Sequence, residues 1–138
     1  MFGRFDINVD DKGRIFVPAK LRETLGETFL VMPGLERCLN VYTEAGWQVI
    51  QARINEMPLA KRAKLRVLLS NIYECKPDKQ GRIALHPRLR EYAKLSQEIV
   101  FLGQGDHAEI WDAARYAGTE EEELSPEYMR SVMEDLEI

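Results

Sequence analysis

One stretch of this chain occurs twice, and this repetition constrains the fold more than any other feature of the sequence. Residues 10–23 align with residues 78–91 at a constant offset of 68, and seven of the fourteen positions are identical. After a one-residue slip, residues 30–34 align with residues 99–103. Agreement over this length indicates two copies of one structural unit.

Each copy has the same predicted order of elements, β-β-α-β-β. Alternating Phe5, Ile7 and Val9 predict a strand, and Gly13 supplies the positive φ that a tight turn over residues 10–13 requires. Pro18 ends the next strand and opens a short helix. The other elements are expected at 15–17, 19–25, 30–32 and 39–42 in copy one, and at 73–75, 83–85, 87–93, 99–102 and 109–111 in copy two.

The size of the unit decides how the two copies combine. A unit of about 45 residues buries too little surface to fold alone. Two copies that pair strand to strand would close a small barrel and remove free sheet edges. We therefore expect a mainly β fold with helices (α+β), forming one small barrel with pseudo-twofold symmetry. Its expected parts are a first repeat (1–46), a helical linker (47–72), a second repeat (73–117) and an acidic tail with a C-terminal helix (118–138).

Apolar stripes at helical spacing predict the structure outside the repeats. Pro58 divides the linker into two helices, the second of which is basic and extends to about Ser70. Ser125 and Pro126 predict the start of the tail helix. The stripe residues are Trp47, Ile50, Ile54 and Met57 in the linker, and Met129, Val132, Met133 and Leu136 in the tail.

Charge is divided unevenly along the chain. The formal net charge is −4, yet residues 118–138 hold eight acidic residues against Arg130 alone, so residues 1–117 sum to +3. Acidic tails are commonly solvated or bind partners. The apolar stripe predicts that the tail helix packs on the body or on a neighbouring chain. The net positive charge of residues 1–117 allows the repeats to form a basic face.

Several classes of function are not expected. No apolar run is long enough for a transmembrane helix, and residues 1–6 do not begin a secretory signal. An enzyme is not expected, because no nucleophile motif or phosphate-binding loop is present. No metal is expected, since Cys38, Cys75, His86 and His107 match no metal-ligand spacing. No cofactor and no small-molecule substrate are expected either. The two cysteines are expected to be packed thiols in a reducing compartment.

The repeated turn is the candidate functional element. Structurally, Asp10 and Asp78 are expected to accept backbone N–H bonds in the turn, while Arg14 and Arg82 pair with them across it. Functionally, the cations of the turns suit phosphate or guanine, which arginine contacts in a bidentate manner. The candidate DNA-binding residues are Arg14, Arg82, Lys12, Lys20, Arg22 and Lys79, and the candidate structural residues of the turns are Asp10, Gly13, Asp78 and Gly81.

Two levels of resemblance start from this turn. The pattern Asp10-x-x-Gly13-Arg14-Ile15-x-x-Pro18 resembles the swapped hairpin of the AbrB and SpoVT class of DNA-binding domains. The double copy is similar to the MraZ family over about residues 1–116. This similarity rests on Met1-Phe2, Asp11-Lys12-Gly13-Arg14, residues 78–83, residues 89–93, residues 100–107 and Glu109-Ile110-Trp111-Asp112. The chain departs from the family pattern at Pro77 and His86.

The resemblance to the MraZ family implies a function. Members are bacterial transcription regulators of the division and cell-wall gene cluster, expected here to repress. They bind repeated boxes in their own promoter as homo-oligomeric rings, and they associate with the nucleoid in the cytoplasm. Carried onto this chain, the resemblance makes double-stranded DNA the partner. Arg14 and Arg82 become the contact residues, with Asp10 and Asp78 as their partners in the turn.

Two other functions remain open at this point. Swapped-hairpin domains also serve as antitoxins, in which a C-terminal segment wraps a protein partner, although these carry one copy per chain. The acidic tail with its methionine stripe suits such a protein-interaction module. A nucleoid-associated protein that binds DNA without sequence preference is the other alternative.

Overall fold

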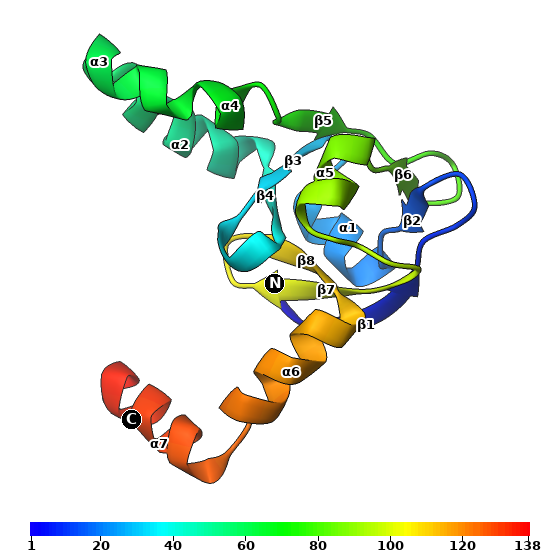
Figure 1. The fold of residues 1–138 in the computed structure, drawn as a ribbon, viewed down its shortest axis with the longest axis vertical. Coiled ribbons are helices and arrows are strands. Elements are labelled where there is room, and N and C mark those ends of the chain that lie inside the picture. Colours follow the sequence, from blue (N-terminus) through cyan, green and yellow to red (C-terminus); the bar gives the residue numbers. More distant parts are fainter.

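The computed structural model describes residues 1–138 and contains eight strands and seven α-helices (Figure 1). The strands are β1 (Phe2–Asn8), β2 (Arg14–Phe16), β3 (Phe29–Pro33), β4 (Leu39–Thr43), β5 (Tyr73–Cys75), β6 (Arg82–Ala84), β7 (Glu98–Gln104) and β8 (Ala108–Asp112). The helices are α1 (Ala19–Leu25), α2 (Glu44–Asn55), α3 (Leu59–Arg62), α4 (Arg66–Leu69), α5 (Pro87–Tyr92), α6 (Ala113–Glu123) and α7 (Pro126–Leu136), with 3-10 turns η1 (Leu35–Arg37) and η2 (Ala63–Leu65).

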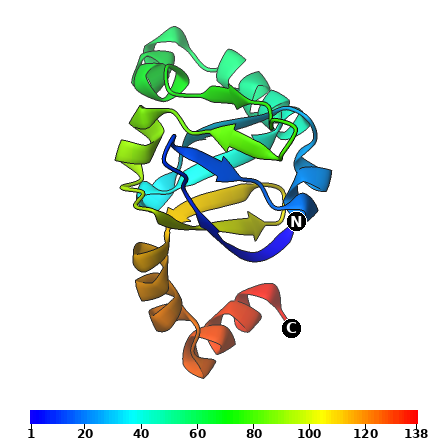
Figure 2. The same ribbon diagram turned by 90° about the vertical axis from the view of Figure 1, so that its right-hand side faces the viewer.

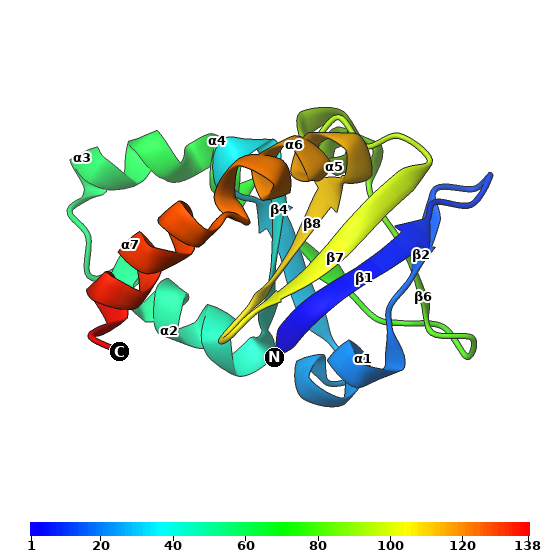
Figure 3. The ribbon, with the colours of Figure 1, turned by 90° about the horizontal axis from the view of Figure 1, so that it is seen from below.

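The strands exchange partners between the two repeats. Six of them form an antiparallel sheet in the order β1-β7-β8-β4-β3-β5, and β2 pairs with β6 in a separate ribbon (Figure 3). In the two repeats, β1 corresponds to β5, β3 to β7 and β4 to β8. When each strand of the sheet is replaced by its counterpart, the same order is obtained, read from the opposite edge. The expected α+β fold of two swapped, pseudo-twofold repeats is therefore confirmed. The sheet and the ribbon enclose the core without joining in one continuous ladder.

Strand alternation places the main core between the sheet, the ribbon, α1 and α5. Side chains at every second position of a strand share one face. On the inner face these side chains are almost fully buried, and they form one cluster with residues of the ribbon and of both helices. The cluster includes Phe29, Val31, Leu39, Val41, Ile99, Phe101 and Ile110 from the sheet, Ile15, Val17, Ile83 and Leu85 around the ribbon, and Leu21, Leu25 and Leu89 from the helices.

The opposite face of the sheet carries a smaller apolar cluster. Val100 and Leu102 alternate with the inward residues of β7, and they pack with Cys38 and Trp111. Tyr116 of α6 covers this cluster, with its ring 5.6 Å from that of Trp111. Helix α6 is therefore docked on the back of the sheet.

Side-chain caps determine where the helices outside the repeats begin. Thr43 accepts a hydrogen bond from the Gly46 backbone over 2.9 Å, so α2 starts ahead of the apolar stripe that begins at Trp47. Asp112 accepts from the Arg115 backbone over 3.3 Å and starts α6. Ser125 then starts α7, so the acidic segment forms two helices where the sequence predicted one.

The two helical segments project from opposite ends of the strand body, the linker helices α2 to α4 from one end and α6 with α7 from the other (Figures 1 and 2). Both arms also extend to one side of the body, and the turns before β2 and β6 lie on the other side (Figure 3). No helix combines the length and the apolar run needed to cross a membrane.

Candidate nucleic-acid interface

The first turn, residues 10–14, is built around the carboxylate of Asp10. One oxygen accepts backbone N–H bonds from Lys12 at 2.9 Å and from Arg14 at 2.8 Å, and the other accepts from Arg14 Nε at 2.8 Å. The backbone hydrogen bond from Arg14 is the main cause that lowers the pKa of Asp10 from its ordinary value. The carboxylate thus holds both the turn and the orientation of the arginine.

The second turn, residues 78–82, repeats this arrangement. Asp78 accepts backbone N–H bonds from Gln80 and Arg82, each at 2.9 Å, and a bond from Arg82 Nε at 3.0 Å. The Arg82 backbone N–H is again the main cause that lowers the pKa of the carboxyl. The two repeats therefore present one geometry twice.

Backbone hydrogen bonds lock the two turns side by side. The Val17 N–H donates to the Gly81 carbonyl over 2.8 Å, and the Leu85 N–H donates to the Gly13 carbonyl over 3.2 Å. Within the ribbon, Ile15 pairs with Ile83 at the centre. The glycine of each turn is thus bonded to the segment that follows the other turn, and this pairing sets the spacing between the two arginines.

Two further arginines, one from each repeat, lie against the turn of the other repeat. Gly81 has a φ of +79°, and a Cβ built there would lie 2.7 Å from Arg22 Cζ. Gly13 has a φ of +75°, and a Cβ there would lie 2.8 Å from Arg90 Cζ. Arg90 Nε donates to the Leu85 carbonyl over 3.2 Å. Each guanidinium thus packs against the backbone of a turn glycine and braces that turn.

Arg22 and Arg90 share a sequence signal. Both follow their turn glycine by nine residues, on the helices α1 and α5. Arg22 is half-buried, with its Cζ 5.3 Å from the ring centroid of Phe16, and its Nε is buried with no hydrogen-bond partner. The periodicity of α1 does not show that this side chain reaches the other repeat.

The remaining candidate DNA-binding residues differ in accessibility. Arg14 and Arg82 each keep 30% of their side chain exposed, and only Nε is hydrogen-bonded, which leaves both Nη groups free. Lys12, Lys20 and Lys79 are exposed and form no ion pair. The turns thus carry free cationic donors around two pre-oriented arginines.

The two departures from the family pattern leave the second turn intact. His86 Nδ1 accepts from the Arg88 backbone over 3.1 Å and caps α5, and its ring stacks on Tyr73 at 4.4 Å. After Pro77, the Asp78 N–H still donates to the Arg82 carbonyl over 2.8 Å. The equivalent bond in the first turn, from the Asp10 N–H to the Arg14 carbonyl, is 2.9 Å long. A histidine therefore serves here as a helix cap.

No group of three side chains capable of holding a metal ion gathers anywhere in the structure. Cys38 and Cys75 are separate buried thiols, and burial raises the pKa of Cys38 to about 12 and that of Cys75 to about 11. A thiol with a pKa this high is a poor nucleophile at neutral pH.

The two arginine-bearing turns are held together by a two-stranded ribbon between swapped repeats. This arrangement defines a class of proteins, the tandem swapped-hairpin proteins. Comparison with known proteins identifies the family within this class. The profile described as "MraZ protein, putative antitoxin-like" matches residues 1–70 and 68–131. The chain belongs to the MraZ family, as its sequence motifs predicted.

Curated relatives agree with this assignment. The transcriptional regulator MraZ of Carboxydothermus hydrogenoformans is 45% identical over 112 residues, which cover 79% of this chain and 78% of that protein. The protein of the same name from Halothermothrix orenii is 39% identical over 140 residues, covering 99% and 98%. That of Moorella thermoacetica is 40% identical over 117 residues, covering 83% and 82%. The family is one of transcription regulators, not of enzymes.

Proposed function

We propose that this protein represses transcription of bacterial division and cell-wall genes by binding repeated boxes of double-stranded DNA upstream of its own gene. The binding unit is the pair of turns, and the active form is a ring of identical subunits. The protein acts in the cytoplasm, on the nucleoid.

The pair of turns is the observation that supports this proposal. Asp10 and Asp78 hold the Nε of Arg14 and Arg82, so the partly exposed side chains keep both Nη groups free without the entropy cost of an unrestrained arginine. Such donors suit a phosphate or the O6 and N7 atoms of guanine. The exposed Lys12 and Lys79 beside them suit phosphate contacts, which position a protein on DNA without reading sequence.

The distribution of charge supports the same orientation of the protein on DNA. The net charge of −4 arises from the tail, which lies on the side of the body opposite the turns (Figure 3). One subunit offers few cations, so a single copy would bind weakly. Repetition of the turns around a ring makes each further contact intramolecular, which raises the overall affinity when the DNA boxes have matching spacing.

The experiment is a titration of the protein with its own upstream DNA against scrambled competitor, at two salt concentrations. Wild type is expected to prefer the upstream DNA and to lose affinity steeply with salt, because counterions are released as phosphates are neutralised. Arg14→Ala is expected to weaken binding by roughly 10-fold or more with the fold intact, since one good base contact contributes about 1–3 kcal/mol. The matched control is Arg53→Ala, an exposed arginine on the linker arm.

Two outcomes would contradict the proposal. Equal binding of the upstream and scrambled DNA would indicate a nucleoid-coating protein. Failure of the folded, assembled wild type to bind either DNA would favour the antitoxin-like alternative, which the name of the family profile and the projecting tail arm support. Loss of the fold in Arg14→Ala would assign that residue a structural role only.

A further inference from the structure

Helix α7 leaves an apolar face uncovered. It packs against α6, where Tyr128 donates a hydrogen bond to Glu123 over 2.7 Å, and it projects away from the strand body (Figures 1 and 2). Tyr128, Met133 and Leu136 remain 42%, 41% and 62% exposed. Apolar side chains gathered on one face of a projecting helix indicate an interaction surface.

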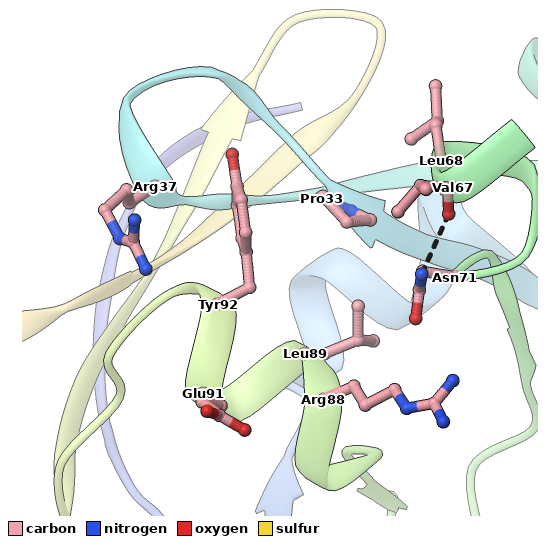
Figure 4. A pocket seen from close by; sticks show the side chains of 9 residues that line it. All are labelled: Pro33, Arg37, Val67, Leu68, Asn71, Arg88, Leu89, Glu91 and Tyr92. Atoms are coloured by element: carbon pink, nitrogen blue, oxygen red, sulfur yellow. Dashed lines mark hydrogen bonds between the residues drawn. The ribbon is translucent and has the colours of Figure 1, made fainter. Parts of the chain in front are cut away.

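A groove of matching character opens at the base of the linker arm. It is a hollow of about 450 Å³ between α4 and α5 (Figure 4). Its apolar lining includes Val67, which is 74% exposed, together with Leu68, Leu89 and Tyr92. These four side chains line one hollow together, and contiguous apolar surface of this kind marks interaction sites, whereas a single exposed apolar residue does not.

Hydrogen bonds preform this groove. Tyr92 donates to the Gly34 carbonyl over 2.6 Å, and its ring lies 5.4 Å from Arg37 Cζ. Asn71 donates to the Val67 carbonyl over 2.8 Å and so fixes the end of α4 (Figure 4). Since its walls are already ordered, the groove can accept a helix with little further loss of conformational entropy.

The helix and the groove carry opposite charge. The groove edge presents Arg37 and Arg88 with one acid, Glu91. The linker arm beside it holds five cations against two acids, whereas the tail holds eight acids against one arginine. Acidic residues therefore flank the apolar stripe of α7 where cations flank the apolar groove, and this complementarity selects α7 as the occupant.

We propose that α7 of one subunit inserts its Met133 and Leu136 face into the α4–α5 groove of a neighbouring copy of this chain. The proposal rests on the self-assembly proposed above and identifies the surfaces that join the subunits. Because the donating and accepting surfaces differ, each subunit can join two others head to tail, and such a contact closes into a ring when its rotation permits.

The attachment of α6 supports a neighbouring copy as the owner of the groove. Arg4 forms an ion pair with Glu120, and the Arg115 guanidinium donates to the carbonyls of Glu36 and Arg37 over 2.7 and 2.9 Å. These contacts hold α6 on β1 and η1, so that α7 is presented outward, separate from the α4 and α5 of its own chain (Figure 1). The tail is thus held ready for another subunit.

The test is the molar mass of the full-length chain in solution, from light scattering on a sizing column. Wild type is expected to form a multi-subunit assembly. Met133→Asp places a charge on the apolar face of α7, and Val67→Asp places a charge in the apolar groove. Each variant is expected to have the mass of one chain. Both positions are exposed, so the fold should persist, as circular dichroism would verify. The matched control is Ser131→Asp, which adds the same charge to the polar face of α7 and should leave the assembly unchanged.

Mixing the two defective variants tests the pairing itself. An equimolar mixture contains one intact tail, on the Val67→Asp chain, and one intact groove, on the Met133→Asp chain, so the mass is expected to rise to that of two chains and no further. A mixture that stays at one chain would overturn the proposal, as would either single variant that assembles like wild type.

The same samples separate this inference from the proposed function. DNA binding by Arg14 and Arg82 is measured independently of mass. If wild type bound its upstream DNA but had the mass of one chain, the tail-to-groove contact would be refuted while DNA binding stood. If wild type assembled through this contact but ignored DNA, the proposed function would fail and the contact would stand.

Discussion

The bracing of each turn by an arginine of the other repeat predicts the cost of adding one methyl group. In Gly81→Ala, the new Cβ meets two penalties. A φ of +79° is unfavourable for alanine by about 1–2 kcal/mol. The Arg22 guanidinium, 2.7 Å from the new atom, must also leave its rotamer, which costs about 0.5–1.5 kcal/mol. The expected loss in the free energy of unfolding is therefore about 1.5–3.5 kcal/mol.

Two controls separate the penalties. Gly105 has a φ of +85°, but its Cβ would meet nothing within 4 Å, so Gly105→Ala should cost only the backbone term of about 1–2 kcal/mol. In an Arg22→Ala background the obstruction is absent, and Gly81→Ala should fall to the same value. The coupling between the two sites is then about 0.5–1.5 kcal/mol.

The assay is urea denaturation of wild type, both single variants, the double variant and the Gly105 control at one protein concentration. Each midpoint, with a shared slope, yields a free energy of unfolding. If Gly81→Ala cost the same with and without Arg22, the arginine would not brace the turn. The reciprocal pair, Gly13 and Arg90, should behave alike because it repeats the geometry.

Three further predictions concern the core, the carboxylates and the thiols. Phe101→Ala removes a fully buried ring and should cost about 3–5 kcal/mol in denaturation experiments; a loss below about 1 kcal/mol would contradict its central position. The folded-state pKa values of Asp10 and Asp78 are lowered, so their stabilising contribution is complete above the unfolded pKa of about 3.9 and disappears as pH falls through the folded values. The denaturation midpoint should therefore fall on acidification below about pH 4, and less steeply in a double Asp→Asn variant. Cys38 and Cys75 should resist a thiol reagent at pH 8 until urea unfolds the chain, and rapid labelling of the native protein would refute their burial.

The sequence alone predicted most of the fold, because the repeat supplied two independent copies of each local signal. Proline, glycine and strand alternation are local properties, and β2, α1, β3 and β4 formed where these signals indicated. The start of α2 was missed by a few residues, since its cap at Thr43 precedes the apolar stripe from which the helix is read. Helix α6, capped by Asp112, was not predicted as a separate helix, because the only apolar stripe recognised in the tail begins at Met129, in α7. The positive φ values of Glu36 and Arg37 were not predictable, because neither position is a glycine.

The candidate site was predictable in part. The spacing of Asp10 and Arg14 indicated an ion pair across a turn, and this pair forms. The bracing role of Arg22 was not predictable, because it depends on a contact with residue 81 of the other repeat. The charge of a side chain can be read from the sequence, whereas its direction depends on packing between distant segments.

The exchange of strands between repeats has a consequence for synthesis of the protein. Residues Phe2–Asn8 pair only with Glu98–Gln104, so the first strand leaves the ribosome long before its partner exists. At about 5–20 residues per second, translation leaves β1 unpaired for roughly 5–20 s. Local hairpins such as β3–β4 can form during that interval, while completion of the sheet depends on contacts of high sequence separation, which slow folding. The nascent chain must therefore remain soluble with an open edge until its second half emerges.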